Sequence, residues 1–90
     1  MERGSLLAPN RYRTAEAALV ADLQHRFRLT PTQARVATLL ADRLTNAEIA
    51  SELRVKPSTA RRHTEAVLFR MGVSSRFAVL GRLAELNRGV

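Results

Sequence analysis

Basic side chains crowd one short stretch of this 90-residue chain. Between Arg54 and Arg76 there are six basic residues and one acidic residue, Glu65. Most of the bases are arginines, whose planar guanidinium can donate two parallel hydrogen bonds to a phosphate or to the edge of guanine. The whole chain has fourteen arginines, one lysine and a net charge of +7. This pattern favours recognition of a polyanion, and nucleic acid is the leading candidate.

Four side chains of the basic stretch are candidates for reading base edges. Arg61 and Arg62 suit the O6 and N7 atoms of guanine, Glu65 can accept a hydrogen bond from N4 of cytosine, and Ser58 can contact either kind of edge. The competing interpretation is a solvated helix face whose charge only opposes aggregation. The placement of the charge must decide between the two interpretations.

Residue types that would support catalysis or metal binding are sparse. The chain has no cysteine, which excludes disulfides, thiolate nucleophiles and cysteine zinc sites. Serine, histidine and aspartate occur without a nucleophile elbow, a phosphate loop or paired carboxylates. His25 has no second ligand at the spacing that a metal needs. We therefore expect no enzyme activity, no metal and no cofactor.

The N-terminal part of the chain divides into two segments. Residues 1–13 contain three arginines but no hydrophobic periodicity, which predicts a flexible basic arm. Residues 14–28 are predicted to form an N-terminal helix capped by Thr14, and residues 29–90 the main helical domain. The apolar stripe expected on that first helix consists of Ala15, Ala18, Leu19, Leu23 and Phe27.

Start signals for further helices follow in close order. Capping boxes at Thr30 to Gln33 and at Thr45 to Glu48 predict one helix ending near Asp42 and a short one near Asn46 to Leu53. Pro57 suits the first position of a longer helix that Gly72 ends, and Ser74 or Ser75 is expected to cap a last one. No strand-like alternation occurs, so the predicted fold class is all-α.

A short helix, a tight connection at residues 54–56 and a longer basic helix together describe a helix-turn-helix. The phase of the longer helix can be counted. One stripe is expected to face the core and consists of Ala60, His63, Thr64, Val67, Leu68 and Met71. The opposite face then carries the four candidate base-reading residues, with Phe69 and Arg70 toward its far end. This agreement of phase and charge favours groove contact over a merely solvated face.

Several segments in order give the chain a specific resemblance: Leu29-Thr30-Pro31, Thr45-Asn46-Ala47-Glu48-Ile49-Ala50, Thr59-Ala60-Arg61-Arg62-His63 and Met71-Gly72-Val73-Ser74-Ser75-Arg76. The chain resembles a LuxR-type (GerE/NarL) DNA-binding domain over about residues 28–84. The resemblance implies a tetrahelical helix-turn-helix, here with an extra N-terminal helix, in which Asn46–Leu53 is the scaffold helix and Pro57–Met71 the recognition helix.

Site roles follow from the same resemblance. Arg61, Arg62 and Glu65 match positions where the family places base-contacting residues. Lys56, Ser58, Thr59, Arg70 and Arg76 match positions that the family uses for contact with the DNA backbone or for local scaffolding. We add Arg54 to the expected backbone contacts, because it belongs to the basic stretch. An alternative for Thr59 is packing or capping.

Four residues depart from the family pattern, which usually has Glu at Gln33, Gly at Arg43, a capping Ser at Lys56 and Val at Ala60. Lys56 lacks the acceptor of a capping serine, so we expect a loss of about 1 kcal/mol at the start of the recognition helix unless Pro57 compensates. Lys56 instead offers a cation to phosphate. Glu65 would be repelled by phosphates unless it contacts cytosine or pairs with Arg61 or Arg62.

The last helix is apolar on nearly every side. If Val79, Leu83 and Leu86 face the core, an apolar patch is left toward solvent, and such a patch normally marks an interface. We therefore predict a homodimer whose interface consists of Phe77, Leu80, Gly81 and Ala84. Close approach of a partner's backbone would explain why a glycine stands inside this helix at position 81. The alternative is that the helix simply tolerates Gly81.

These observations predict a homodimeric, sequence-specific regulator of transcription that binds the major groove of double-stranded DNA. One alternative is a protein-interaction module that docks on RNA polymerase or another regulator; another is a domain like region four of sigma factors. RNA polymerase is also a candidate partner under the first hypothesis. Since the start of the chain lacks the apolar run of a signal peptide and no long apolar stretch follows, we expect a cytoplasmic bacterial protein without membrane contact.

Overall fold

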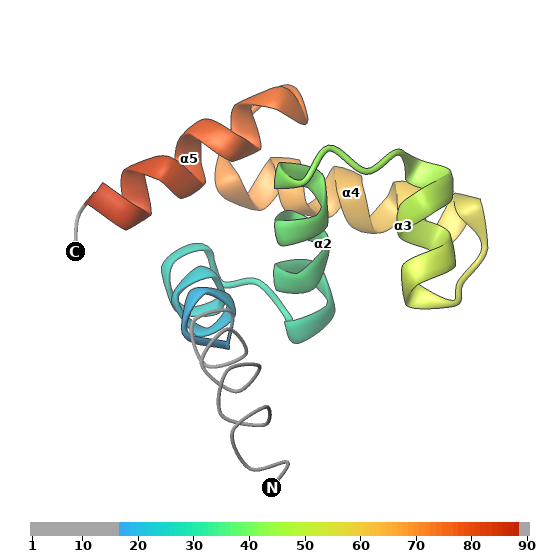
Figure 1. The fold of residues 1–90 in the computed structure, drawn as a ribbon, viewed down its shortest axis with the longest axis horizontal. Helices are drawn as coiled ribbons and strands as arrows, with labels where there is room; N and C mark the ends of the chain where they lie inside the picture. The colour runs from blue at the N-terminus through green and yellow to red at the C-terminus, as the bar shows by residue number, and fades with distance from the viewer. Residues whose placement is uncertain (1–16, 89–90) are drawn as a thin grey trace, which may run out of the picture.

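The computed structural model describes residues 17–88, and every regular element in that range is an α-helix (Figure 1). Residues 17–27 are helical and are followed by α2 (Pro31–Ala41), α3 (Asn46–Leu53), α4 (Pro57–Met71) and α5 (Phe77–Arg88). The predicted all-α fold class is therefore confirmed. The predicted basic arm at residues 1–13 and the cap at Thr14 lie outside the described residues.

Both predicted capping boxes are present. The Thr30 hydroxyl accepts from the backbone N–H of Gln33 at 3.1 Å, and the Gln33 side chain accepts from the backbone N–H of Thr30 at 3.1 Å. Thr45 and Glu48 form the same reciprocal pair at 3.1 and 2.8 Å. Each box satisfies backbone donors that the first turn leaves free, so α2 and α3 begin where the sequence indicated.

The helices end on residues in the left-handed region. Gly72 ends α4 with φ 70°, as predicted, and its N–H donates back to the last turn. Arginines occupy the other such positions among the described residues: Arg28, Arg43 and Arg54 have φ of 57°, 66° and 60°. Arg43 stands where the family pattern has glycine, and its positive φ gives the physical reason for that preference, because glycine alone lacks the Cβ that crowds this conformation.

The core lies where α2 and α4 cross, with α3 and α5 packed at opposite ends of α4 (Figure 1). Its largest fully buried side chains beyond the N-terminal helix come from all four labelled helices: Val36, Ile49, Val67, Met71 and Val79. The short helix α3 buries Ile49 and Ala50 against its neighbours. An eight-residue helix has little stability alone, so this packing is what holds α3 in place for the turn into α4.

The N-terminal helix is part of the same core. Leu23 is fully buried, and Leu19, Val20 and Phe27 pack partly buried against the core. Ala15 of the predicted stripe lies outside the described residues. One other position is wrong: Ala18 is exposed, and Val20 packs in its place. An alanine offers little area to bury, so the larger Val20 sets the rotation of this helix.

The last helix begins later than predicted. α5 starts at Phe77, so the expected N-cap at Ser74 or Ser75 is wrong. The first backbone bonds run from Ala78 N–H to Ser75 carbonyl oxygen and from Val79 N–H to Arg76 carbonyl oxygen, at 3.1 and 3.2 Å. None of the described helices is long and apolar enough to cross a membrane.

Candidate nucleic-acid interface

The buried stripe of α4 faces the core as the sequence predicted. Ala60, Thr64, Val67 and Met71 are buried, while His63 and Leu68 are half-buried at the edges of the stripe. The hydroxyl of Thr64 lies 3.5 Å from Oδ1 of Asn46 and links the middle of α4 to the start of α3. The rotation of α4 about its own axis is thereby fixed.

The opposite face of α4 presents the candidate base-reading residues to solvent. Ser58, Arg61, Arg62 and Glu65 are all exposed. Within the described part of the chain, none of these four side chains takes part in a hydrogen bond or an ion pair. Glu65 therefore does not form the internal pair with Arg61 or Arg62 that the sequence left open, and both guanidiniums keep their donors for an external acceptor.

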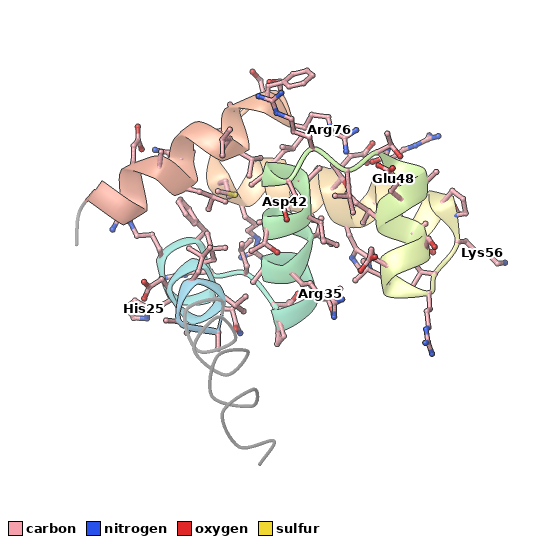
Figure 2. All side chains as sticks on the ribbon, in the orientation of Figure 1. His25, Arg35, Asp42, Glu48, Lys56 and Arg76 are labelled. Atoms are coloured by element: carbon pink, nitrogen blue, oxygen red, sulfur yellow. The ribbon has the colours of Figure 1, made fainter. Side chains whose placement is uncertain are left out.

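The start of α4 has a cation where most helices have a polar cap. Lys56 makes no side-chain capping bond, as expected, although its carbonyl accepts from the N–H groups of Thr59 and Ala60 at 3.0 Å each. Its side chain extends from the edge of the molecule into solvent (Figure 2). Arg54 is exposed beside it, and Thr59 is half-buried. Two cations therefore gather at this end of α4, where the helix dipole is also positive.

The turn of the helix-turn-helix is closed by backbone contacts. Arg54 caps α3 in the left-handed conformation, and the N–H of Val55 donates to the carbonyl of Ala50 at 3.0 Å. Val55 packs partly buried against the core. These contacts set the angle at which α4 leaves α3, so the exposed face of α4 is held on a rigid support.

Arg76 lies at the junction of three elements rather than on the outward face of α4. Its Nη2 donates to the carbonyl of Leu44 at 2.8 Å and lies 3.5 Å from Oδ1 of Asn46. Figure 2 shows Arg76 at the start of α5, against the connection between α2 and α3. The resemblance left DNA-backbone contact or local scaffolding open for Arg76, and the structure shows a scaffolding contact. Its partner could not be identified from spacing, because it is a backbone atom 32 residues away.

Two other arginines hold the far end of α4. Arg70 donates to the carbonyl of Arg28 at 3.3 Å. Arg82 donates through Nε and Nη2 to the carbonyl of Met71 at 3.2 and 3.0 Å, and its guanidinium lies 5.7 Å from the ring centre of Phe27. Sequence reasoning missed Arg82; the only local signal is its pairing with Glu85 three residues later. These contacts satisfy carbonyls that the end of a helix leaves free.

The exposed side of α5 is apolar, as the sequence predicted. Phe77 is 80% exposed and Leu80 is 45% exposed, and Gly81 and Ala84 also face solvent, whereas Val79 and Leu83 are buried. Leu86 belongs to α5, but its side chain lies outside the described residues. Beside the patch is a hollow of about 240 Å³ lined mainly by Leu40, Ala41 and Leu44 together with Phe77 and Leu80. A Cβ added at Gly81 would meet nothing within 4 Å, so the backbone there is open to a neighbour.

The chain matches the model of a known protein family. The model for bacterial regulatory proteins of the luxR family matches residues 28–81, from the end of the N-terminal helix to the middle of α5. No match was found among curated proteins or among solved structures. The matched segment contains the helix-turn-helix and all of the candidate base-reading residues.

Proposed function

Since this chain belongs to the LuxR family of bacterial regulatory proteins, we propose that it regulates transcription by inserting α4 into the major groove of specific double-stranded DNA. LuxR-type helix-turn-helix domains are DNA-binding regulators rather than enzymes. The observation that carries the proposal is the outward face of α4. There Arg61 and Arg62 are exposed and have no hydrogen-bond or ion-pair partner among the described residues, opposite the stripe that buries Ala60, Thr64, Val67 and Met71.

Base recognition falls to four side chains of that face. Arg61 and Arg62 donate to O6 and N7 of guanine, and each such bidentate contact discriminates against the wrong base by about 1–3 kcal/mol. Glu65 accepts from N4 of cytosine, which gives an otherwise repelled carboxylate a favourable partner. Ser58 contacts a base edge near the start of α4.

Backbone contacts position the domain on the duplex. Lys56 and Arg54 meet phosphates at the start of α4, and Thr59 adds a hydroxyl there. Arg70 and Arg76 each donate from one nitrogen to a backbone carbonyl of the protein. Because a guanidinium has five N–H donors, their remaining N–H groups can bind phosphate while the contact to the carbonyl persists. Such contacts dominate affinity and make it depend on salt.

A homodimer completes the proposal. Two copies meet through Phe77, Leu80, Gly81 and Ala84, and their α4 helices enter successive major grooves on half-sites about 10 base pairs apart. An apolar patch on a small domain supports this arrangement, because burial of Phe77 and Leu80 against a second copy removes them from water. We place this binding in the cytoplasm, where a bacterial regulator meets its DNA.

The test is selection of duplex DNA from a random pool by the purified chain at about 0.15 M salt, with excess competitor DNA to suppress nonspecific binding. We expect a palindromic motif with half-sites one turn apart. The double variant Arg61→Ala/Arg62→Ala should lose it. The charge-matched control Arg26→Ala/Arg35→Ala changes two exposed arginines outside α4 and should retain it.

The competing function is docking on RNA polymerase or another regulator. Under that hypothesis selection would recover no motif, and the Arg61→Ala/Arg62→Ala variant would still dock on its protein partner. A palindromic motif lost only in the α4 variant would exclude docking as the main role of this face.

A further inference from the structure

Phe69 is an unusual residue for the place it occupies. It lies in the last turns of α4 and is 83% exposed, more than either of the other large apolar side chains that are exposed among the described residues. At about 100° per residue, Phe69 projects within about 20° of Ser58 and of Arg62 around the helix axis. It therefore stands in the same row as two of the residues assigned to base recognition, directly opposite the buried stripe.

Packing within the domain does not account for this ring. The core stripe of α4 is complete without it, and the hydrophobic cluster of the domain does not include it. Its neighbour Arg70 is held by the carbonyl of Arg28, so the local backbone is anchored by a contact that leaves the ring free. Phe69 is thus an exposed apolar group toward the far end of a polar, mainly cationic face.

The distance along α4 puts Phe69 within reach of the groove that Arg62 reads. Seven residues separate the two, which is about 10 Å along the helix axis, or about three base steps. The apolar feature that a base pair presents in the major groove is the C5-methyl group of thymine, and phenylalanine is among the side chains suited to contact it.

Given the proposed DNA binding, on which this inference rests, we infer that Phe69 is a specificity-determining residue that packs on the methyl group of a thymine in each half-site. Arg61, Arg62 and Glu65 read hydrogen-bonding edges, and Phe69 adds a preference for A·T over G·C at one further position. The ring gains burial against the methyl only when that thymine is present.

The experiment uses the highest-affinity duplex selected by the full chain. Each thymine of a half-site is replaced in turn by deoxyuridine, which removes the methyl and preserves every hydrogen bond. We expect one position at which this change weakens binding by about fourfold, the effect of burying one methyl group. In the Phe69→Ala variant overall affinity should fall and deoxyuridine at that position should have no further effect, whereas Phe69→Leu should remain sensitive.

The outcomes separate this inference from the proposed function. The role of Phe69 in base recognition is overturned if the chain selects a motif but no thymine methyl affects binding. It is also overturned if the Phe69→Ala variant is as sensitive to deoxyuridine as the parent chain. In either case a protein partner becomes the explanation for the exposure of Phe69. If the chain selects no motif at all, the proposed function falls and the inference with it. Because Phe69 is exposed, its replacement should leave the thermal melting curve unchanged, which checks that the fold is intact.

Discussion

Arg76 donates from Nη2 to the carbonyl of Leu44 at 2.8 Å and so ties the start of α5 to the connection that precedes α3. The carbonyl belongs to a segment just before the Thr45 cap, and the same nitrogen lies 3.5 Å from Oδ1 of Asn46, the first residue of α3. A single guanidinium thus links the start of α5 to the start of α3.

Replacement Arg76→Ala should lower the free energy of unfolding by about 2 kcal/mol, since a half-buried carbonyl loses a charged donor. Urea denaturation at fixed protein concentration measures the loss. Arg70→Ala is the control, because its bond to the carbonyl of Arg28 is longer, at 3.3 Å, and exposed. Equal losses in the two variants would show that Arg76 is no more structural than Arg70.

Arg43→Gly should stabilise the domain. Arg43 has φ 66°, a conformation that costs a residue with a Cβ about 1–2 kcal/mol, and the greater freedom of glycine in the unfolded chain offsets part of that gain. We expect a net increase of about 0.5 kcal/mol, seen as a small rise of the melting temperature. Arg43→Ala removes the same side chain but keeps the Cβ, so a rise there as well would attribute the effect to charge instead of backbone strain.

Lys56→Ser should change stability and DNA binding in opposite directions. A serine cap should add about 1 kcal/mol to the stability of the domain, because α4 has no side-chain cap now. Loss of one phosphate contact should make the slope of log affinity against log salt shallower by about 0.9 per protomer. Lys56→Ala should reproduce the change in slope without the gain in stability, and an unaltered slope in both variants would remove Lys56 from the interface.

Leu80→Glu should dissociate the proposed homodimer. A carboxylate buried in an apolar interface without a partner is costly, so sedimentation should show a monomer where the parent chain is a dimer. Ala78→Glu places the same charge on an exposed position of α5 beside the patch and should remain dimeric. Should both variants stay dimeric, the contact surface must lie elsewhere.

Local signals predicted most of the fold because they act between near neighbours. Thr30 with Gln33 and Thr45 with Glu48 lie three residues apart, and such pairs fix helix starts whatever surrounds them. The periodicity of α4 likewise gave its buried stripe and its outward face, which is why the placement of Arg61 and Arg62 could be read from sequence.

The remaining features depend on contacts that spacing does not encode. Arg82 reaches the carbonyl of Met71 and the ring of Phe27 from another helix, and only the assembled fold brings these together. Arg54 adopts a positive φ that its residue type disfavours, because the tight turn into α4 requires it. The start of α5 at Phe77 was missed because backbone carbonyls, instead of a serine side chain, receive its first N–H groups.

Leu23 and Leu83 lie in the core, at 0% and 6% exposure, yet both fall outside residues 28–81, which the luxR family model matches. Together with Arg82 over Phe27, they close the domain from its two ends. The cooperative folding unit is consequently larger than the segment that the family model matches. A fragment trimmed to the motif would lose both buried leucines and the guanidinium that seals α4, and would expose its remaining aliphatic interior to water.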